Sequence, residues 1–312
     1  MRRPTIFLDR DDTLIANSSL DWSAGPSASP KLTPGDLCDP NRVRLLPAAL
    51  EGCRLLHAAG YQLVMVTNQG LVARGGGSLA DVERTNDRVR ELLTFNGSPL
   101  IAATYACPMH PKGNLPRFTR EHPWRKPAGG MIRAAADELD LDLARSWLVG
   151  DAERDIEAAV DAGIARERTI RVGGLVPDLL AATLIILAQR TTPSGLVTGR
   201  LTAAPLAAPL ADDAVRRIVV ATAHAIAERV GVELVEIRAD DAGVAVTLRG
   251  SRVTAMGFLA ELRRLTNRWH RDKLGSDLWP TTDRPPPDAG WLDPPDPDSP
   301  QPDPSEPDRG TR

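Results

Sequence analysis

The first part of the chain alternates short apolar runs with longer segments of helical periodicity. The apolar runs lie at 5–8, 61–66, 101–106, 146–150 and 169–172. Most of these runs are continuous, as is typical of strands in a parallel sheet that is covered on both faces. Segments with helical patterns lie between them, near 47–59, 78–95, 128–139 and 153–162. This alternation predicts a doubly wound α/β domain with a parallel sheet over residues 1–175.

The rest of the chain follows a different pattern. Residues 176–210 are expected to form an apolar helix and then a linker rich in proline and alanine. Residues 211–280 show a helix-strand-strand-helix order, which predicts a small α+β domain whose role the pattern does not indicate. Residues 281–312 are rich in proline and acidic residues and have little to bury, so we expect a disordered tail.

Charge and cysteine content narrow the class of protein. The formal net charge is −3, which gives no general attraction to nucleic acid or to an anionic membrane. The apolar run at 179–188 is too short to span a bilayer, and the first residues turn acidic too early for a signal peptide. The three cysteines form no even, closely spaced set, which favours reduced thiols. We therefore expect a cytoplasmic protein without a nucleic-acid or membrane partner.

The first polar cluster follows the first apolar run, in the stretch "DRDDT". A doubly wound sheet carries its sites at the carboxyl ends of its strands, so Asp9 and Asp11 would lie at such an edge. Carboxylates this close repel each other unless they share a proton or a cation, and Mg²⁺ prefers such hard oxygen ligands. One carboxylate could then attack phosphorus, and the other could act as general acid and base. Taken alone, the cluster could also be a polar turn.

Three further clusters lie at expected strand ends or helix starts. Asp151 and Asp155, four residues apart in "GDAERD", would share one helix face and could bind a cation or cap the helix. Thr67 and Asn68 in "TNQG" could donate hydrogen bonds to a phosphate or make a turn. Lys126 precedes a proline that could open the following helix, and a lone Arg-Lys pair usually lies on a solvated surface.

Together, the four clusters resemble the haloacid dehalogenase (HAD) superfamily. The stretches that carry the resemblance are "FLDRDDTLI", "VTNQGLVARG", "RKPAGGM" and "VGDAERDIEAAVDAG". More narrowly, they are similar to the small-capped branch that holds D-glycero-D-manno-heptose 1,7-bisphosphate 7-phosphatases and histidinol-phosphate phosphatases. The resemblance covers residues 4–173 and does not extend to residues 190–312.

The resemblance implies a catalytic role for four residues. Asp9 would be the nucleophile and a Mg²⁺ ligand. Asp11 would be the general acid and base, with its backbone carbonyl on the metal. Thr67 would hydrogen-bond the phosphoryl group, and Lys126 would neutralise its charge.

The resemblance also assigns metal-binding and substrate-binding residues. Asp151 would be a Mg²⁺ ligand, and Asp155 would lie behind it and orient the site. Asn68 and Arg125 match positions that help to hold the substrate.

The sequence departs from the pattern of the branch at two positions near these motifs. Asp12 stands where the family usually has glycine, and aspartate can tolerate unusual turn geometry. Gly70 stands where the second motif usually has serine, so a hydroxyl near the substrate is lost.

The largest departure concerns a loop that binds zinc in the sugar-bisphosphatase branch. Cys107 is kept, His110 lies next to the position of the family histidine, and His122 stands where the family has a cysteine. These three residues could make a three-ligand site, whereas structural zinc almost always has four ligands. The alternative is a metal-free loop in which Trp124 packs against the fold. Zinc is therefore a doubtful cofactor, and the substrate could differ from that of the branch.

The favoured interpretation is a Mg²⁺-dependent phosphatase of a small phosphorylated metabolite, with an aspartyl-phosphate intermediate on Asp9. A sugar phosphate is expected, specifically the heptose bisphosphate. Histidinol phosphate or another phosphomonoester is the alternative substrate. The rival from another class is a non-catalytic binding or scaffold protein on the same fold.

Overall fold

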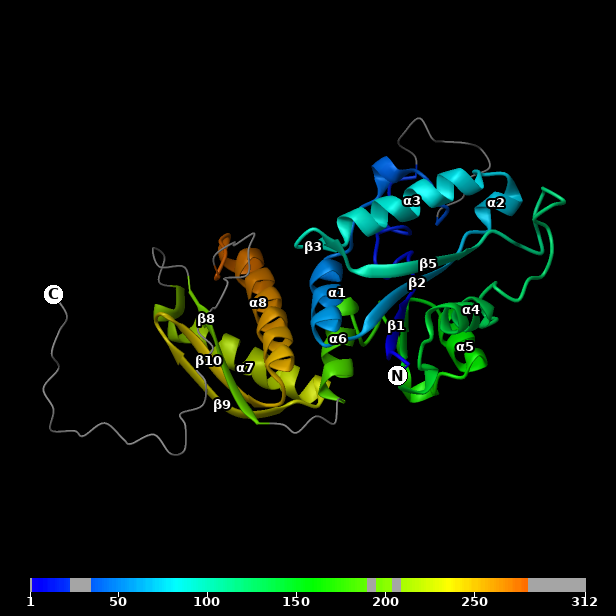
Figure 1. Ribbon diagram of the computed structural model, residues 1–312. Coiled ribbons are helices and arrows are strands. Elements are labelled where there is room, and N and C mark those ends of the chain that lie inside the picture. The colour runs from blue at the N-terminus through cyan, green and yellow to red at the C-terminus, as the bar shows by residue number, and fades with distance from the viewer. Residues whose placement is uncertain (1, 23–34, 190–194, 204–208, 280–312) are drawn as a thin grey trace, which may run out of the picture. The chain divides into compact units, whose positions relative to one another are not determined.

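The computed structural model describes residues 2–22, 35–189, 195–203 and 209–279 (Figure 1). The chain divides into two compact units, Met1–Arg190 and Thr191–Arg312. The tail expected at 281–312 lies outside the described residues. Among the described helices, none is both long enough and apolar enough to cross a membrane.

The first unit is built on a five-stranded sheet with the order β5-β2-β1-β6-β7. All of its neighbouring strands pair in parallel. The strands are β1 (Thr5–Leu8), β2 (Gln62–Asn68), β5 (Ile101–Cys107), β6 (Trp147–Gly150) and β7 (Thr169–Arg171). Each of the five apolar runs in the sequence is a strand of this sheet, so the predicted parallel α/β fold is confirmed.

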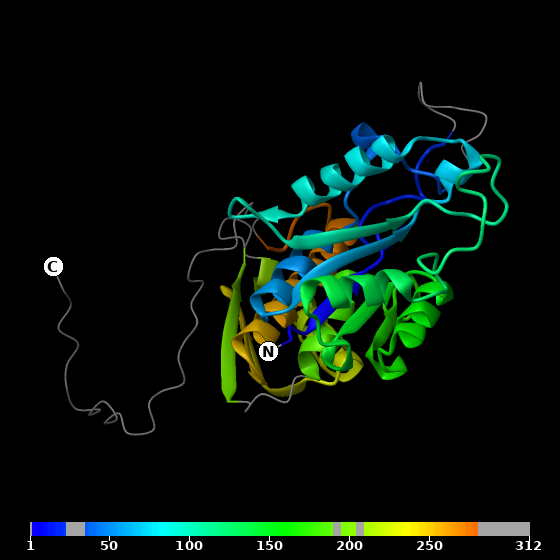
Figure 2. The same ribbon diagram turned by 45° about the vertical axis from the view of Figure 1, so that its right-hand side comes forward.

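Helices cover both faces of the sheet, as the continuous apolar runs require. The helices are α1 (Ala49–Ala58), α3 (Leu79–Leu92), α4 (Gly130–Leu139), α5 (Glu153–Ala162) and α6 (Leu179–Ala188). Along β1, Ile6 and Leu8 join the buried cluster that includes α1, α3 and α6, whereas Phe7 joins the cluster of α4 and α5. Figure 2 shows α3 (cyan) and the pair α4 and α5 (green) on opposite sides of the sheet. Short elements complete the unit: α2 (Leu71–Arg74), β3 (Thr94–Phe95), β4 (Ser98–Pro99), η1 (Pro40–Arg42), η2 (Leu143–Arg145) and η3 (Arg166–Arg168).

Helix α6 belongs to the first unit, although the sequence pattern grouped it with the linker. It packs closely on α1, where a Cβ on Gly52 would lie only 2.9 Å from Cγ of Leu179. Leu179 and Ile186 are part of the same buried cluster as the sheet residues. The first unit therefore extends past residue 175, because α6 completes the apolar layer over the sheet.

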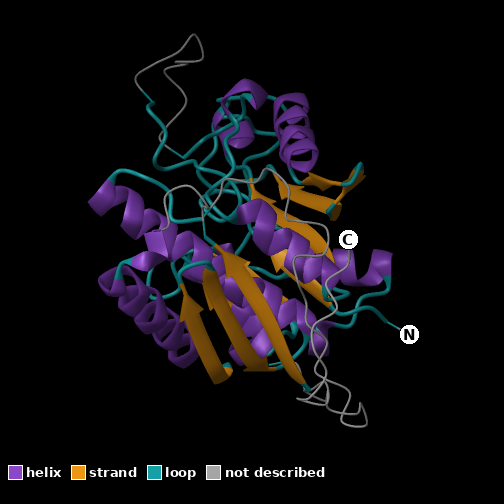
Figure 3. Cartoon of the chain, turned by 90° about the vertical axis from the view of Figure 1, so that its left-hand side faces the viewer, coloured by secondary structure: helices purple, strands orange, loops and turns teal. Residues whose placement is uncertain are grey.

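The second unit holds a three-stranded antiparallel sheet and two long helices (Figure 3). Its strands are β8 (Leu196–Thr202), β9 (Glu233–Asp240) and β10 (Gly243–Arg249), in the order β8-β10-β9. Its helices are α7 (Asp213–Val230), α8 (Arg252–Leu274) and the short η4 (Pro209–Ala211). The expected order α7-β9-β10-α8 is present.

Strand β8 was missed because it lies inside the range expected to be a linker. Its sequence, "LVTGRLT", has a central glycine, and glycine is depleted in strands. The strand pairs with β10 along its whole length, from Leu196 opposite Arg249 to Thr202 opposite Gly243. Tertiary pairing therefore overrides a weak local preference.

Candidate active site

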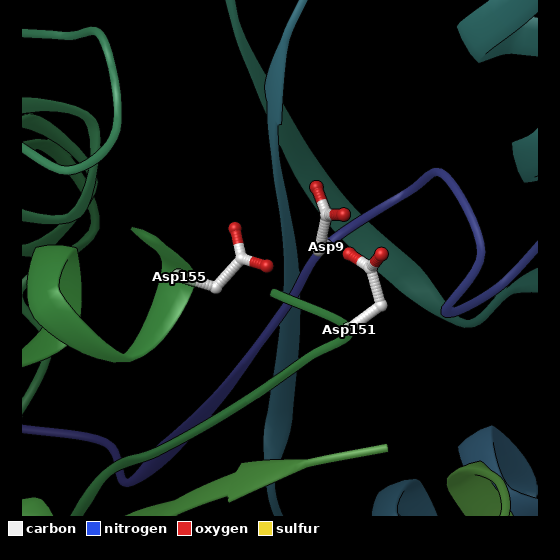
Figure 4. A group of neighbouring side chains, drawn as sticks. All are labelled: Asp9, Asp151 and Asp155. Carbon is white, nitrogen blue, oxygen red and sulfur yellow. The ribbon is translucent and has the colours of Figure 1, made fainter. Parts of the chain in front are cut away.

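The candidate residues meet at the carboxyl-terminal edge of the parallel sheet. Asp9 follows β1, Thr67 and Asn68 end β2, and Asp151 follows β6. These three strands are neighbours in the sheet, so their ends lie side by side. Asp155 approaches from the first turn of α5, and Figure 4 shows its carboxylate beside those of Asp9 and Asp151.

The three aspartates form a group that could hold a metal ion. Asp9, Asp151 and Asp155 each contribute a carboxylate oxygen, and these atoms lie within 4.8 Å of one another. Oδ1 of Asp151 is buried and has no hydrogen-bond partner among the described residues. A buried acceptor without a donor is costly, and a hard divalent cation would satisfy it. The donor set therefore fits Mg²⁺.

The electrostatics of Asp9 support the same conclusion. Burial raises the pKa of Asp9 to about 8, and the nearby carboxylates of Asp155 and Asp11 act in the same direction against the lowering effect of Lys126. Burial also raises the pKa of Asp151, with Asp155 adding to the effect. A cation among these oxygens would favour the ionised carboxylates that a nucleophile and a metal ligand need.

Lys126 is the cation that the protein itself supplies. Its side chain is 2 % exposed, and its Nζ donates to Oδ1 of Asp9 at 2.5 Å and to the carbonyl of Val66 at 3.0 Å. The same Nζ lies 2.7 Å from Oδ1 of Asp155. Burial alone would lower the pKa of Lys126, but Asp9 and Asp155 raise it. The lysine is therefore held protonated beside the candidate nucleophile.

Asn68 makes a different contact from the expected one with substrate. Its side-chain carbonyl accepts the backbone N–H of Lys126 at 3.0 Å, and its amide donates to the carbonyl of Lys126 at 2.9 Å. Both polar groups of the side chain are therefore engaged with the lysine backbone. In this structure Asn68 fixes the position of Lys126.

Asp155 also has a local structural role. Its Oδ2 accepts the backbone N–H of Ala152 at 3.0 Å, which satisfies a donor at the start of α5. The carboxylate lies so close to the backbone that a Cβ on Gly150 would stand 2.6 Å from Cβ of Asp155. The glycine before Asp151 is therefore required for this packing.

Two buried residues that the sequence reasoning did not select surround Asp11. Nε2 of Gln69 donates to Oδ2 of Asp11 at 2.9 Å and to Oγ1 of Thr67 at 2.8 Å. The guanidinium of Arg10 donates to both oxygens of Asp11 at 3.0 to 3.2 Å. Both residues lie inside the motifs, but glutamine and arginine there carry no signal that distinguishes them from solvated neighbours.

Asp12 adopts the unusual backbone geometry that the family glycine indicated. Its φ is +56°, in the left-handed region, so the expectation that aspartate tolerates this turn is confirmed. Its Oδ1 accepts the backbone N–H groups of Asn17 and Ser18, each at 2.9 Å. Asp12 therefore stabilises the turn after β1.

The degenerate zinc loop does not gather its candidate ligands. Among the described residues, Cys107, His110 and His122 do not form a group with ligand atoms within 4.8 Å of one another. Nδ1 of His110 accepts the backbone N–H of Lys112, and Nδ1 of His122 accepts that of Trp124. Trp124 packs edge-on against Tyr105 with 5.9 Å between ring centroids, so its expected packing against the fold is confirmed.

Arg125 lies half-buried next to the glycine of the altered second motif. Its Nη1 donates to the carbonyl of Met109 at 3.1 Å. A Cβ on Gly70 would lie 2.9 Å from Cδ2 of His110 and 3.1 Å from Nη1 of Arg125. The imidazole and the guanidinium therefore occupy the space that a serine side chain would need.

The parallel fold and the acidic site define a phosphatase of the HAD superfamily. The HAD-hydrolase-like family matches residues 123–170. The D-glycero-alpha-D-manno-heptose-1,7-bisphosphate 7-phosphatase of Burkholderia mallei (strain ATCC 23344) is 34% identical over 164 residues, which cover 53% of this chain and 78% of that protein. The D-glycero-beta-D-manno-heptose-1,7-bisphosphate 7-phosphatase of Rhodopseudomonas palustris (strain ATCC BAA-98 / CGA009) is 33% identical over 193 residues, covering 62% and 96%.

The chain is also similar to a solved structure. The D,D-heptose 1,7-bisphosphate phosphatase from B. bronchiseptica, complexed with magnesium and phosphate, is 27% identical, with a TM-score of 0.46; the match covers 60% of this chain and 99% of that one. From the relatives, the chain belongs to the HAD superfamily, in the family that includes these 7-phosphatases, and it is a phosphoric monoester hydrolase.

Proposed function

We propose that the chain is a Mg²⁺-dependent phosphatase of a sugar phosphate, and that its substrate is D-glycero-D-manno-heptose 1,7-bisphosphate, hydrolysed at the 7-phosphate. The observation that carries the proposal is the meeting of Asp9, Lys126 and Asp151 at one edge of the sheet. The names of the relatives support the choice of substrate. The free thiols of all three cysteines support the cytoplasm as its location.

In the proposed mechanism, Asp9 attacks phosphorus and forms an aspartyl-phosphate. The bond between phosphorus and the ester oxygen breaks, and Asp11 gives its proton to the leaving oxygen. Asp11 then takes a proton from water, which attacks phosphorus and releases Asp9 and phosphate. Thr67 and Lys126 stabilise the charge that is spread over the transferring group.

Mg²⁺ would be held by Asp9, Asp151 and the backbone carbonyl of Asp11, and it would neutralise charge on the phosphoryl group. In this proposal Asp155 orients Lys126 from behind the ligands, because its Oδ1 lies 2.7 Å from Nζ.

Positive charges around Arg125 support a substrate with a second anionic group. Burial lowers the pKa of Arg125, and the nearby guanidiniums of Arg74 and Arg154 act in the same direction against the raising effects of Cys107 and Glu121. Burial likewise lowers the pKa of His110, and Arg125 and Arg74 add to the effect. Cations that crowd together in this way favour an anion that relieves their repulsion. In our proposal, Arg125 binds the phosphate that is not hydrolysed.

The test is a comparison of phosphorylated metabolites with the purified full chain and Mg²⁺, monitored by released phosphate. We expect the highest kcat/KM for the heptose 1,7-bisphosphate. A higher value for histidinol phosphate or a nucleotide would overturn the substrate assignment.

The Asp9→Asn variant tests the chemistry itself. We expect it to release no phosphate, whereas the control Asp137→Asn, at an exposed position on α4, should match the unmodified chain. Equal rates for Asp9→Asn and the unmodified chain, or no activity in either, would favour a non-catalytic binding protein.

A further inference from the structure

Arg10 is a buried cation that the mechanism above does not use. Its side chain is fully buried, at 0 % exposure. A buried guanidinium is costly unless its donors are paired. The contacts that pair it therefore indicate why the chain keeps a charge at this position.

Two contacts anchor the guanidinium to segments that are distant in sequence. Nη1 donates to Oδ1 of Asn86 on α3 at 2.9 Å, and Nη2 donates to the backbone carbonyl of Leu37 at 2.9 Å. Asn86 is itself buried, at 6 % exposure. The planar group is thus fixed in orientation by helix α3 and by the loop that carries Leu37, both outside the catalytic motif.

The guanidinium of Arg10 also contacts the carboxylate of Asp11, and Nη2 takes part in both sets of contacts. Nε and Nη2 each lie within 3.0 to 3.2 Å of both oxygens, which is a fork-like contact. The same carboxylate borders the phosphoryl-binding position, because Oγ1 of Thr67 donates to its Oδ2 at 3.4 Å. The orientation of Asp11 toward the site is therefore set by Arg10 on one side and by the end of β2 on the other.

We propose that Arg10 is a positioning residue that holds the Asp11 carboxyl group in line for proton transfer to the leaving oxygen. This inference rests on the proposed function, because it concerns the acid of that reaction. The guanidinium also matches the carboxylate that Asp11 becomes when the ester bond breaks and its proton moves to the leaving oxygen. Arg10 acts only through Asp11 and does not contact the phosphoryl group.

If Arg10 is a positioning residue, the activity lost when it is replaced should depend on the leaving group of the substrate. A sugar alkoxide leaves poorly and needs the proton, whereas 2,4-dinitrophenolate leaves readily without one. The value of kcat/KM reports formation of the aspartyl-phosphate and not its hydrolysis. A comparison of the two substrates by kcat/KM therefore isolates the step in which Asp11 is the acid.

The experiment measures kcat/KM of the full chain with Mg²⁺ for the heptose bisphosphate and for 2,4-dinitrophenyl phosphate. We expect Arg10→Met to lower kcat/KM for the sugar by about 10- to 100-fold and for the aryl ester by less than about threefold. Asp11→Asn should show the same preference more strongly. Arg10→Lys should recover part of the loss, because an ammonium can donate to one carboxylate oxygen but not as a fork.

A second variant keeps the test informative if Arg10→Met does not fold. Asn86→Ala removes one anchor of the guanidinium and leaves the charge, so it should lower the sugar activity selectively but to a smaller extent. The matched control is Arg88→Met, an exposed arginine on the same helix that pairs with Glu91; it should leave both activities unchanged.

The outcomes separate this inference from the function on which it rests. If Arg10→Met lowers kcat/KM equally for both substrates, Arg10 has a structural role only. If it lowers kcat/KM for neither substrate, Arg10 does not position Asp11. An unmodified chain that hydrolyses neither ester with Mg²⁺ would overturn the proposed function as well.

Discussion

The side-chain amide of Asn68 forms hydrogen bonds with both backbone polar groups of Lys126. This pair couples the end of β2 to the loop that carries the lysine. We predict that Asn68→Ala lowers kcat by about 10- to 100-fold, because a misplacement of about 1 Å at a reacting centre can cost that much. KM should change little, and steady-state kinetics on the preferred sugar phosphate measure both constants.

Asn68→Asp is the matched variant, because it keeps the acceptor for the N–H of Lys126 and loses the donor. It should retain more activity than Asn68→Ala. A rise in KM at unchanged kcat would instead assign Asn68 to direct substrate contact.

Asp151 should determine the affinity for Mg²⁺. Removal of metal by a chelator should abolish phosphate release, and added Mg²⁺ should restore it. Asp151→Asn should raise the Mg²⁺ concentration for half-maximal activity by at least about 10-fold, since even residues behind metal ligands change affinity by about 10- to 100-fold. Calorimetric titration with Mg²⁺ provides a readout that does not depend on turnover.

The exposed position Asp137 on α4 supplies the control for this experiment. Asp137→Asn has the same change in charge and should leave the Mg²⁺ affinity unaltered. An unchanged affinity in Asp151→Asn would remove Asp151 from the metal site.

Asp12 combines a left-handed backbone with a hydrogen-bonding role, and two substitutions separate these effects. Asp12→Ala loses the acceptor for Asn17 and Ser18 and keeps a Cβ at φ +56°. Asp12→Gly loses the same acceptor but relieves the backbone. We expect Asp12→Gly to be the more stable of the two by about 1 kcal/mol in urea unfolding. An alanine variant as stable as the glycine variant would contradict this account.

The second unit contains a buried carboxylate that joins its two long helices. Glu261 on α8 is fully buried. Its carboxylate accepts hydrogen bonds from Nη2 of Arg229 on α7 and from Nε of Arg264, each at 2.8 Å. Glu261→Gln should lower the free energy of unfolding by about 2 kcal/mol, below the usual cost of breaking a buried pair because both arginines are partly exposed.

The surface pair of Glu236 and Arg238 provides the control, because both side chains are largely exposed. Glu236→Gln should change the free energy of unfolding by less than about 0.5 kcal/mol. If the two glutamate variants were equally stable, the buried cluster would not be holding the helices together.

The part of the candidate site that the sequence predicts consists of acidic residues that directly follow a buried strand. Asp9 and Asp151 are such residues, and the rule that parallel strands end at one edge brings them together. Lys126 was identified only through the order of the motifs, since no local pattern distinguishes it from a surface lysine. Its backbone is held by the Asn68 contact, which joins segments that are distant in sequence.

The features that were missed depend on tertiary contacts without a local signal. The fork of Arg10 on Asp11 requires Asn86, 76 residues further along the chain, to fix the guanidinium. Strand β8 forms because β10 offers it an edge, despite its central glycine. In both cases the local sequence is compatible with several structures, and a distant partner selects one.

The close packing of α6 on α1 determines how short a folded fragment of the first unit can be. A fragment that stops at β7 would expose the apolar side chains that Leu179 and Ile186 now cover, including those around Gly52. Such a fragment would expose an apolar patch and would aggregate. The shortest catalytic fragment worth producing therefore ends beyond Ala188, with α6 retained.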